Sequence, residues 1–445
     1  MLFRSGQPVT APAASAARWA RLVDCRPGEG RALWWSFSGF FLLLAGYYVL
    51  RPVREEMGVQ IGPEKLQWAF SLTLAGMLAI VPLYGWAAAR LPRRALLATV
   101  FGITALVLAG FQAWIAGGAS PAAALALFVW VSVFNLVVVS LFWTAMADSF
   151  AHAQARRLFG MIAAGGSSGA LVGPLITAFA VHAVGVHGLL LVSAALMMLS
   201  LLCILRVVGG HSRPEVGRPL GGNILAGLAE VAASPYLLMI ALVIVLQSVV
   251  GTLVYFEQAR LVKAAALTTE TRTQLFAVID LAVNLLALGL QAMVAGRLMH
   301  RLGLGITLAA VPLLLAVPLA VLAAIPVLTA VLITQVISRA GGHGLMRPAR
   351  EALFTAVDRE ARYKAKNVLD TLVSRAGDAL GGWLYAAAGL STSGVALAAI
   401  PGALALGWLG LRLGRRYRQQ VDATADAGTG EQAGQGALAA TLKLK

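Results

Sequence analysis

The residues with the clearest chemical potential lie in one charged stretch, residues 339–382, of an otherwise apolar chain. Four of them follow one another at spacings of four, four and three, which places them on one face of a helix: Arg339, His343, Arg347 and Arg350. Three more enter the next apolar run: Asp370, Arg375 and Asp378. A charge at membrane depth costs about 2.5–3.5 kcal/mol even on the mildest insertion scale, so such groups usually line a polar path. The pattern predicts half of a solute-binding site.

The composition places the remaining chain in a lipid bilayer. Of 445 residues, 59% are hydrophobic and only 12% are charged, about half the charged share of soluble domains. Apolar stretches of about twenty residues recur, which is the length needed to cross a membrane. Helices are expected, because each satisfies its own backbone hydrogen bonds in lipid. The first apolar run begins at Leu33 and is long enough to remain as an anchor.

Hydropathy predicts twelve transmembrane helices, with the usual uncertainty at their ends. We expect them at residues 32–50, 66–89, 95–117, 122–147, 159–184, 187–208, 235–256, 274–298, 304–325, 327–346, 368–390 and 394–412.

The net charge of +16 could indicate a nucleic-acid partner, but the topology explains it better. In this layout 27 of the 35 Lys and Arg residues fall in segments on one side and 6 in loops on the other, while Arg339 and Arg375 lie within spans. The positive-inside rule then places both termini in the cytoplasm. We expect a multi-pass protein of the bacterial inner (plasma) membrane with no nucleic-acid partner.

The chain divides into two similar halves. A break rich in glycine and proline at residues 209–234 separates six spans from six, and corresponding loops are basic, at 90–94 and 297–301. We predict a cytoplasmic tail at 1–30, one six-helix bundle at 31–208, a central cytoplasmic loop at 209–234, a second bundle at 235–413 and a disordered cytoplasmic tail at 414–445. Two pseudo-symmetric six-helix bundles are the organisation of the major facilitator fold.

Several motifs resemble a known family. They are the runs YVLRPVREE at 48–56, FWTAMAD at 142–148, ARRLFG at 155–160, RPARE at 347–351 and YKAKNVLD at 363–370. Together they resemble the ATP/ADP translocase family of plastids and intracellular bacteria, and more closely its shorter bacterial relatives. The resemblance covers most of residues 31–412. It implies a fold of the major facilitator type and exchange of anionic, phosphate-bearing solutes.

The resemblance also implies roles for individual residues. Arg51, Arg54 and Glu55 match a family pattern of Arg, Lys and Asp at the end of the first span. Two further patterns of cations and acids are matched by Pro348, Arg350, Glu351, Lys364, Lys366 and Asp370. The chain departs from the family at Asp378, where the translocases carry Lys. An acid there disfavours a nucleotide with three or four negative charges.

From these patterns we assign candidate roles. The predicted substrate-binding residues are Arg51, Arg54, Arg339, Arg375 and Asn284. Coupling or charge balance is assigned to Asp280, Asp378 and Glu55. The gate or inner surface is assigned to Arg347, Arg350, Lys364, Lys366 and Asp370.

Structural alternatives stay open for these residues. Arg339 could instead pair with Asp378 or Asp370, and Arg375 could form a permanent pair with Asp378. Asp280, Asn284 and Gln291 share a helix face, so they either line a cavity or bond a neighbouring helix. Lone amides in other spans are predicted to be packing contacts: Gln112, Asn135 and Gln247. Gly165, Gly169 and Gly173 recur every four residues, which indicates a close helix contact.

The sequence therefore predicts a secondary transporter that moves a small anionic solute by alternating access, with protons as a candidate coupling ion. A phosphorylated or nucleotide-like solute is the favoured kind. One alternative is a proton-coupled exporter of lipophilic cations, and another is a non-transporting receptor or scaffold. We expect a monomer with no enzymatic activity, no cofactor and no metal. Cys25 lies in the predicted tail and Cys203 inside an apolar helix, so we expect no disulfide.

Overall fold

The computed structural model describes residues 25–118, 120–208 and 224–442, and over these ranges every regular element is helical. The first bundle contains five continuous elements: α2 (Gly30–Ile61), α3 (Leu66–Arg90), α4 (Arg93–Ala116), α5 (Pro121–Ser149) and α6 (His152–Val208). α6 is two spans, because Gly185 at φ 70° makes a turn inside it. Positive φ is a conformation that glycine adopts without a Cβ clash.

The second bundle begins with α7 (Ile224–Ala233), α8 (Pro235–Ala264), α9 (Thr269–Gly289), the π-helical turn η1 (Leu290–Ala295) and α10 (Gly296–Ala324). It continues with α11 (Leu328–Gly341), the π-helical turn η2 (Gly342–Met346), α12 (Arg347–Leu353) and the short η3 (Phe354–Ala356). It ends with α13 (Arg359–Val368), the π-helical turn η4 (Leu369–Val373), α14 (Ser374–Ala388) and α15 (Thr392–Leu442). Gly303 at φ 82° separates two spans within α10.

The predicted spans overlap these helices. In the described ranges, eight helices are long and apolar enough to cross a membrane, and two of them contain the turns at Gly185 and Gly303. The tenth and eleventh spans are shorter and carry more charge; they form the segments α11–η2–α12 and α13–η4–α14. Serine caps with a following proline start α5 and α8: the Ser120 and Ser234 hydroxyls accept hydrogen bonds from the backbone N–H groups of Ala123 and Leu237.

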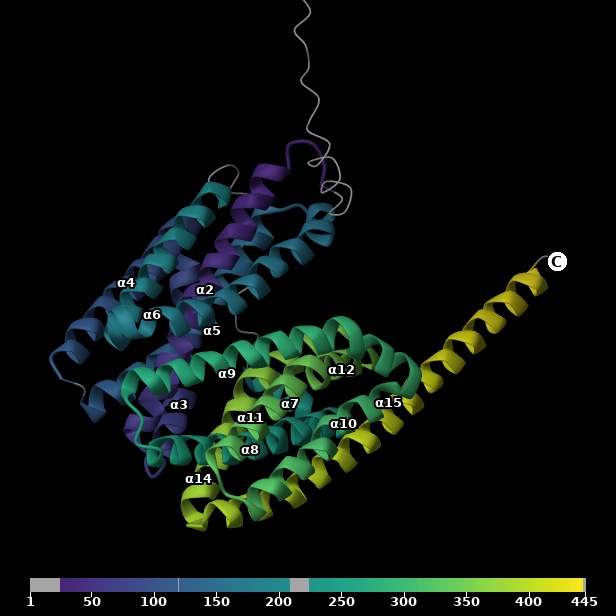
Figure 1. Ribbon diagram of the computed structural model, residues 1–445. Helices are drawn as coiled ribbons and strands as arrows, with labels where there is room; N and C mark the ends of the chain where they lie inside the picture. The colour runs from purple at the N-terminus through teal and green to yellow at the C-terminus, as the bar shows by residue number, and fades with distance from the viewer. Residues whose placement is uncertain (1–24, 119, 209–223, 443–445) are drawn as a thin grey trace, which may run out of the picture.

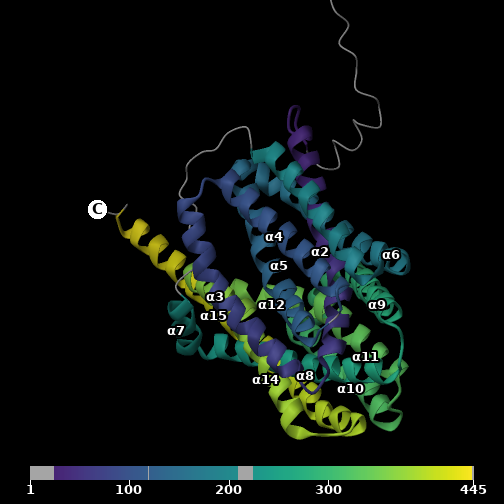
Figure 2. The same cartoon turned by 90° about the vertical axis from the view of Figure 1, so that its left-hand side faces the viewer.

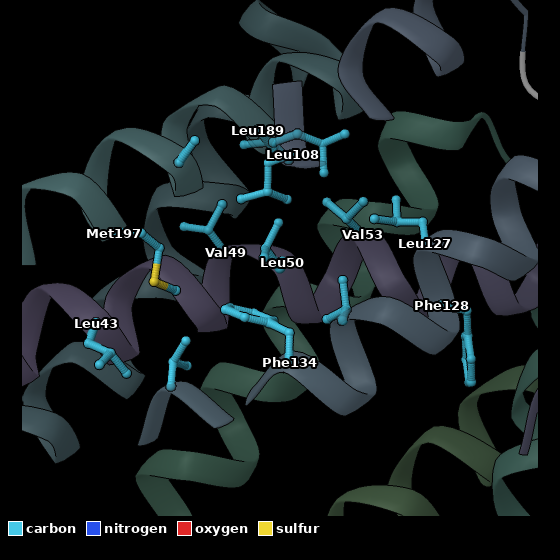
Figure 3. Close-up of a cluster of buried hydrophobic side chains, with 14 of the residues drawn as sticks. Leu43, Val49, Leu50, Val53, Leu108, Leu127, Phe128, Phe134, Leu189 and Met197 are labelled. Carbon is cyan, nitrogen blue, oxygen red and sulfur yellow. The ribbon is translucent and has the colours of Figure 1, made fainter. Parts of the chain in front are cut away.

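α2 forms the centre of the first bundle and packs most closely on α6. A Cβ added at Gly165, Gly169 or Gly173 would lie 2.2–2.6 Å from a backbone oxygen of α2, a distance that no side chain tolerates. The predicted close contact is confirmed, and its partner is α2. Figure 3 shows the buried side chains around this helix, including Leu50 and Val53 of α2 and Leu127 of α5. In lipid such packing is held by van der Waals contact rather than by exclusion of water.

The two bundles meet along α2, α3 and α6 on one side and α8, α9 and α14 on the other. Figures 1 and 2 show the first bundle above the second, with α3 reaching down beside α8 and α14. For brevity, the end of the bundles where α2 begins is called the tail end, and the end where α2 stops at Ile61 is called the far end.

Two of the predicted domain segments contain helices. Residues 414–442, predicted as a cytoplasmic tail, form the end of α15, which continues as a helix beyond the bundle. The central segment contains the helix α7, which packs on α13. Residues 1–24, 209–223 and 443–445 lie outside the described ranges.

Candidate functional site

A cavity of about 540 Å³ lies between the two bundles. Its walls come from α2, α3 and α5 of the first bundle and from α8, α11, η2, α12, η4 and α14 of the second. The charged side chains of the wall are Arg51, Arg54, Glu55, Arg339, Arg347, Arg350, Asp370, Arg375 and Asp378. Residues that the sequence assigned to separate spans therefore share one cavity.

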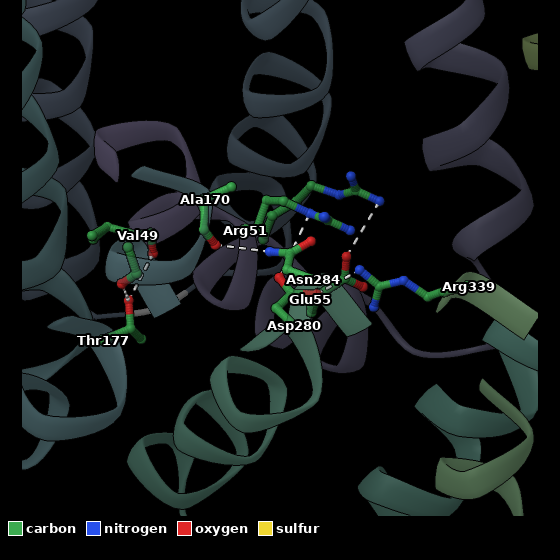
Figure 4. A network of polar contacts seen from close by, with 10 residues as sticks. Val49, Arg51, Glu55, Ala170, Thr177, Asp280, Asn284 and Arg339 are labelled. Carbon is green, nitrogen blue, oxygen red and sulfur yellow. Dashed lines mark hydrogen bonds and ion pairs between the residues drawn. The ribbon is translucent and has the colours of Figure 1, made fainter. Parts of the chain in front are cut away.

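Asp280 of α9 is buried behind this wall, with 1% of its side chain exposed. Its Oδ1 accepts a hydrogen bond from Nη2 of Arg339 in α11, and its Oδ2 lies 3.6 Å from Nε of Arg51 in α2. Figure 4 shows the two guanidinium groups on either side of the carboxylate. One acid thus holds two arginines from different bundles. A lone buried carboxylate would be costly, and these two cations compensate it.

Arg54 occupies the same end of α2. Its Nη2 lies 3.6 Å from Oε1 of the neighbouring Glu55, and its guanidinium stacks on Phe128 of α5, 4.6 Å from the ring centroid. Its Nε is buried without a hydrogen-bond partner among the described residues. Arg54 therefore retains donors that can receive an anionic group.

The second bundle supplies two ion pairs within its own wall. Nη1 of Arg375 lies 3.1 Å from Oδ2 of Asp378, three residues further along α14. Nη2 of Arg350 in α12 lies 3.0 Å from Oδ1 of Asp370 in η4. The open alternative for Arg339, a pair with Asp370 or Asp378, is wrong, because Asp280 occupies that place.

Besides the buried Asp280, three predicted site residues do not line the cavity. Asn284 of α9 turns to the other bundle, where its Nδ2 donates to the backbone oxygen of Ala170 at 2.8 Å (Figure 4). Lys366 of α13 pairs with Glu351, and Lys364 is also absent from the wall. Helical spacing places residues on one face but does not say which neighbour that face meets, so Asn284 is an interhelical contact and not a wall residue.

Several wall residues were missed by the sequence reasoning. Aromatic side chains line part of the cavity: Tyr47, Tyr48, Phe70 and Tyr255. Asn135 and Gln247 also line it, so their interpretation as packing contacts is wrong. A polar amide inside an otherwise apolar span was the available signal, because an unsatisfied amide is costly in lipid. Two of the three π-helical turns contribute wall residues, His343 from η2 and Asp370 from η4.

Ion pairs join the two bundles at the far end. Glu56 of α2 receives two hydrogen bonds from Arg272 at the start of α9, at 2.8 and 2.6 Å. Nζ of Lys263, at the end of α8, lies 3.3 Å from Oε1 of Glu64. At the tail end, by contrast, Glu29 pairs with Arg157 and Arg93 pairs with Asp148, each within the first bundle.

The arrangement suits binding of an anion rather than covalent chemistry. The wall carries six arginines and three acids, and the arginine fork matches carboxylate and phosphate geometry. Within the described ranges, no group of three or more His, Cys, Asp or Glu side chains is placed to hold a metal ion.

Fold and sequence agree on the class of protein. A model of the Major Facilitator Superfamily matches residues 36–381, so the chain belongs to that superfamily and is a transporter of the major facilitator type. The predicted all-helical major facilitator fold is thereby confirmed.

Solved structures show the same fold. A mutant form of the nucleoside transporter NupG has a TM-score of 0.64 at 14% identity, covering 86% of this chain and 99% of that one. The POT family transporter PepTSo has a TM-score of 0.65 at 14% identity, covering 88% and 99%. A bacterial homologue of the iron transporter ferroportin, described as inward-facing, has a TM-score of 0.61 at 14% identity, covering 86% and 98%. A search of curated protein sequences finds no match for this chain, so the resemblance to the ATP/ADP translocases stays a prediction.

Proposed function

We propose that this chain is a secondary active transporter of the bacterial inner membrane that moves a small anionic solute by alternating access. The observation that carries the proposal is the cavity between the bundles, with six arginines and three acids in its wall. Guanidinium groups at membrane depth are costly unless water or a partner meets them. A negative solute that enters the cavity would be such a partner, and a phosphate ester or carboxylate fits the arginine donors.

Arg51, Arg54, Arg339 and Arg375 are the proposed binding residues. Arg51 and Arg54 lie on the first bundle and Arg339 and Arg375 on the second, so a bound anion would touch both. A solute that bridges two bundles can favour one arrangement of them over another, which is what alternating access requires. Asp280 and Asp378 are the proposed charge-balancing groups, with protons as the candidate coupling ion.

The structure supports a form open at the tail end. The bridges at Glu56–Arg272 and Glu64–Lys263 join the bundles at the far end. If the basic loops face the cytoplasm, as the charge distribution indicates, the tail end is cytoplasmic and this form faces inward. Residues of one chain line the cavity, so we propose a site that needs no second copy, as in a functional monomer.

Export of lipophilic cations is the less favoured alternative. It would require an acid free to meet the cation, yet each acid of the wall already has an arginine within 3.6 Å: Glu55, Asp370 and Asp378. A scaffold without transport would not need charges around a central cavity.

Uptake into liposomes tests the proposal. Purified protein would be reconstituted, and labelled phosphate esters and organic acids would be supplied with and without a pH gradient. We expect uptake of an anion that Arg54→Ala and Arg339→Ala each reduce about tenfold or more, the loss expected for a charged hydrogen bond. Arg412→Ala is the matched control, because Arg412 stacks on Trp408 away from the cavity.

Two results would count against the proposal. Anion uptake that survives both cavity substitutions would remove the binding assignment. Uptake of cations alone, abolished by Asp378→Asn, would favour the exporter.

A further inference from the structure

Arg347 differs from the other arginines of the cavity wall, because it forms no ion pair with a carboxylate of the described residues. Its side chain is exposed in the cavity, and no ion pair or hydrogen bond joins its guanidinium to any residue that the structure describes. The other five arginines each have an acid: Asp280 for Arg51 and Arg339, Glu55 for Arg54, Asp370 for Arg350 and Asp378 for Arg375.

The charges of the site do not balance. Six guanidinium groups face four carboxylates, the three of the wall and the buried Asp280, so the surplus is two positive charges with His343 counted as neutral. The surplus has two locations. One charge is Arg347, and the other is shared by Arg51 and Arg339, which divide a single carboxylate between them.

The two locations are separated along one helical segment. Arg339 and Arg347 are eight residues apart in α11–η2–α12, which corresponds to about 12 Å of helix rise. The long side chains of Arg339 and Arg347 can reach toward one ligand from either end of this segment. A single small anion, however, cannot lie close to the backbone at both positions. The separation favours a ligand with two anionic groups.

We propose that the transported solute is a dianion whose two anionic groups are bound separately, one by Arg347 and the other by the Arg51–Arg339 pair. A dicarboxylate is the simplest member of this class. The inference rests on the proposed function. It specifies the charge of the solute and the separation of its two anionic groups. It gives Arg347 a role in selecting the solute, beyond its predicted place at the gate.

Ligand-induced thermal stabilisation of the full chain in detergent tests this inference, since a ligand that binds the folded state raises Tm according to its Kd. The probes are succinate, glutarate and adipate, the monocarboxylates of equal length, citrate and sulfate, all at one ionic strength. We expect at least one dicarboxylate to bind on the order of tenfold more tightly than its monocarboxylate, the difference expected for one charged hydrogen bond.

The variants separate charge from structure. Arg347→Gln should bring that dicarboxylate down to the affinity of its monocarboxylate and leave the monocarboxylate unchanged, while Arg347→Lys should restore part of the difference. Arg412→Gln, which removes an arginine outside the cavity, should change neither affinity.

The outcomes that overturn the inference are distinct from failure of the proposed function. Equal binding of mono- and dicarboxylates, an equal loss of both in Arg347→Gln, or tightest binding by citrate or by compact sulfate would overturn the separated dianion and leave anion transport standing. Absence of binding by every anion would contradict both.

Discussion

The bridge between Glu56 and Arg272 should decide which end of the cavity is closed. Glu56 is fully buried at the far end of α2, and Arg272 meets both of its carboxylate oxygens from α9. Gln60 adds a hydrogen bond to the same carboxylate at 3.1 Å. The bridge exists only while the bundles touch at the far end. Replacing Glu56 with Gln removes the charge and keeps the shape, so it weakens this arrangement relative to one that is open there.

The geometry sets the size of the effect. A charge-assisted hydrogen bond contributes about 1.5–3 kcal/mol net, and Arg272, with 16% of its side chain exposed, can regain some hydration. A loss of about 2 kcal/mol corresponds to a shift on the order of 30-fold in the equilibrium between the two arrangements. Glu64→Gln is the matched control. It also bridges the bundles at the far end, to Lys263, but both side chains are about half exposed, so at most about 1 kcal/mol is expected.

Distances between two spin labels report the equilibrium. Lys65 and Ala265 are exposed at the far end on opposite bundles, and they can be changed to cysteine after Cys25 and Cys203 are replaced by alanine. We expect Glu56→Gln to add a longer-distance population and Glu64→Gln to leave the distribution close to that of the parent protein. If the two variants give the same distribution, the bridge does not hold the far end closed.

Three further predictions follow from particular contacts. Gly169→Ala places a Cβ 2.2 Å from the Phe41 backbone oxygen and should destabilise the chain by about 1–3 kcal/mol in thermal unfolding. Gly102→Ala, whose Cβ meets open space, should not destabilise it. Equal losses of stability in the two variants would refute the α2–α6 contact. Asp280→Ala leaves Arg51 and Arg339 without their carboxylate and should cost about 3–5 kcal/mol of unfolding free energy, while unchanged stability would mean that the triad is not formed. Hydrogen bonds from Arg157 and from the Arg26 backbone lower the pKa of Glu29 to about 2, so its contribution to stability is complete above its ordinary pKa of 4.5 and is lost as the pH falls toward the folded value. Between about pH 5 and pH 3, Glu29→Gln should therefore lose less Tm than the parent protein, and parallel curves would contradict this.

The sequence was most informative about features whose free-energy cost depends on a residue or a short stretch alone. Twelve apolar stretches predict twelve spans, because hydrophobic length is a local property. Arg339 stood out for the same reason, since its charge is costly wherever its helix crosses the membrane. Gly169 predicted close packing because only a residue without a Cβ permits it. Predicting these features did not require knowing which helices pack against one another.

Pairing could not be predicted in the same way. Asp280 joins Arg51 and Arg339 only because α9 packs beside both α2 and α11. Asn284 lies one turn from Asp280 yet bonds α6, because the two faces of α9 meet different neighbours. The π-helical turns η2 and η4 widen their helices where the wall forms. The residue spacing does not predict these turns. The far-end bridge of Glu56 was also missed, since its partner lies in the other half of the chain.

Solute protection of a cysteine in the cavity wall tests the central claim most directly. Ser338 lines the cavity beside Arg339, and Ser338→Cys is a small change that can be made after Cys25 and Cys203 are replaced. The rate at which a water-soluble thiol reagent modifies this cysteine would be measured with and without an anion that the liposomes take up. We predict slower modification at anion concentrations that saturate uptake, and no protection once Arg54 and Arg339 are both alanine. An unchanged rate in the presence of a transported anion would place the solute elsewhere and contradict the arginine-lined cavity as its binding site.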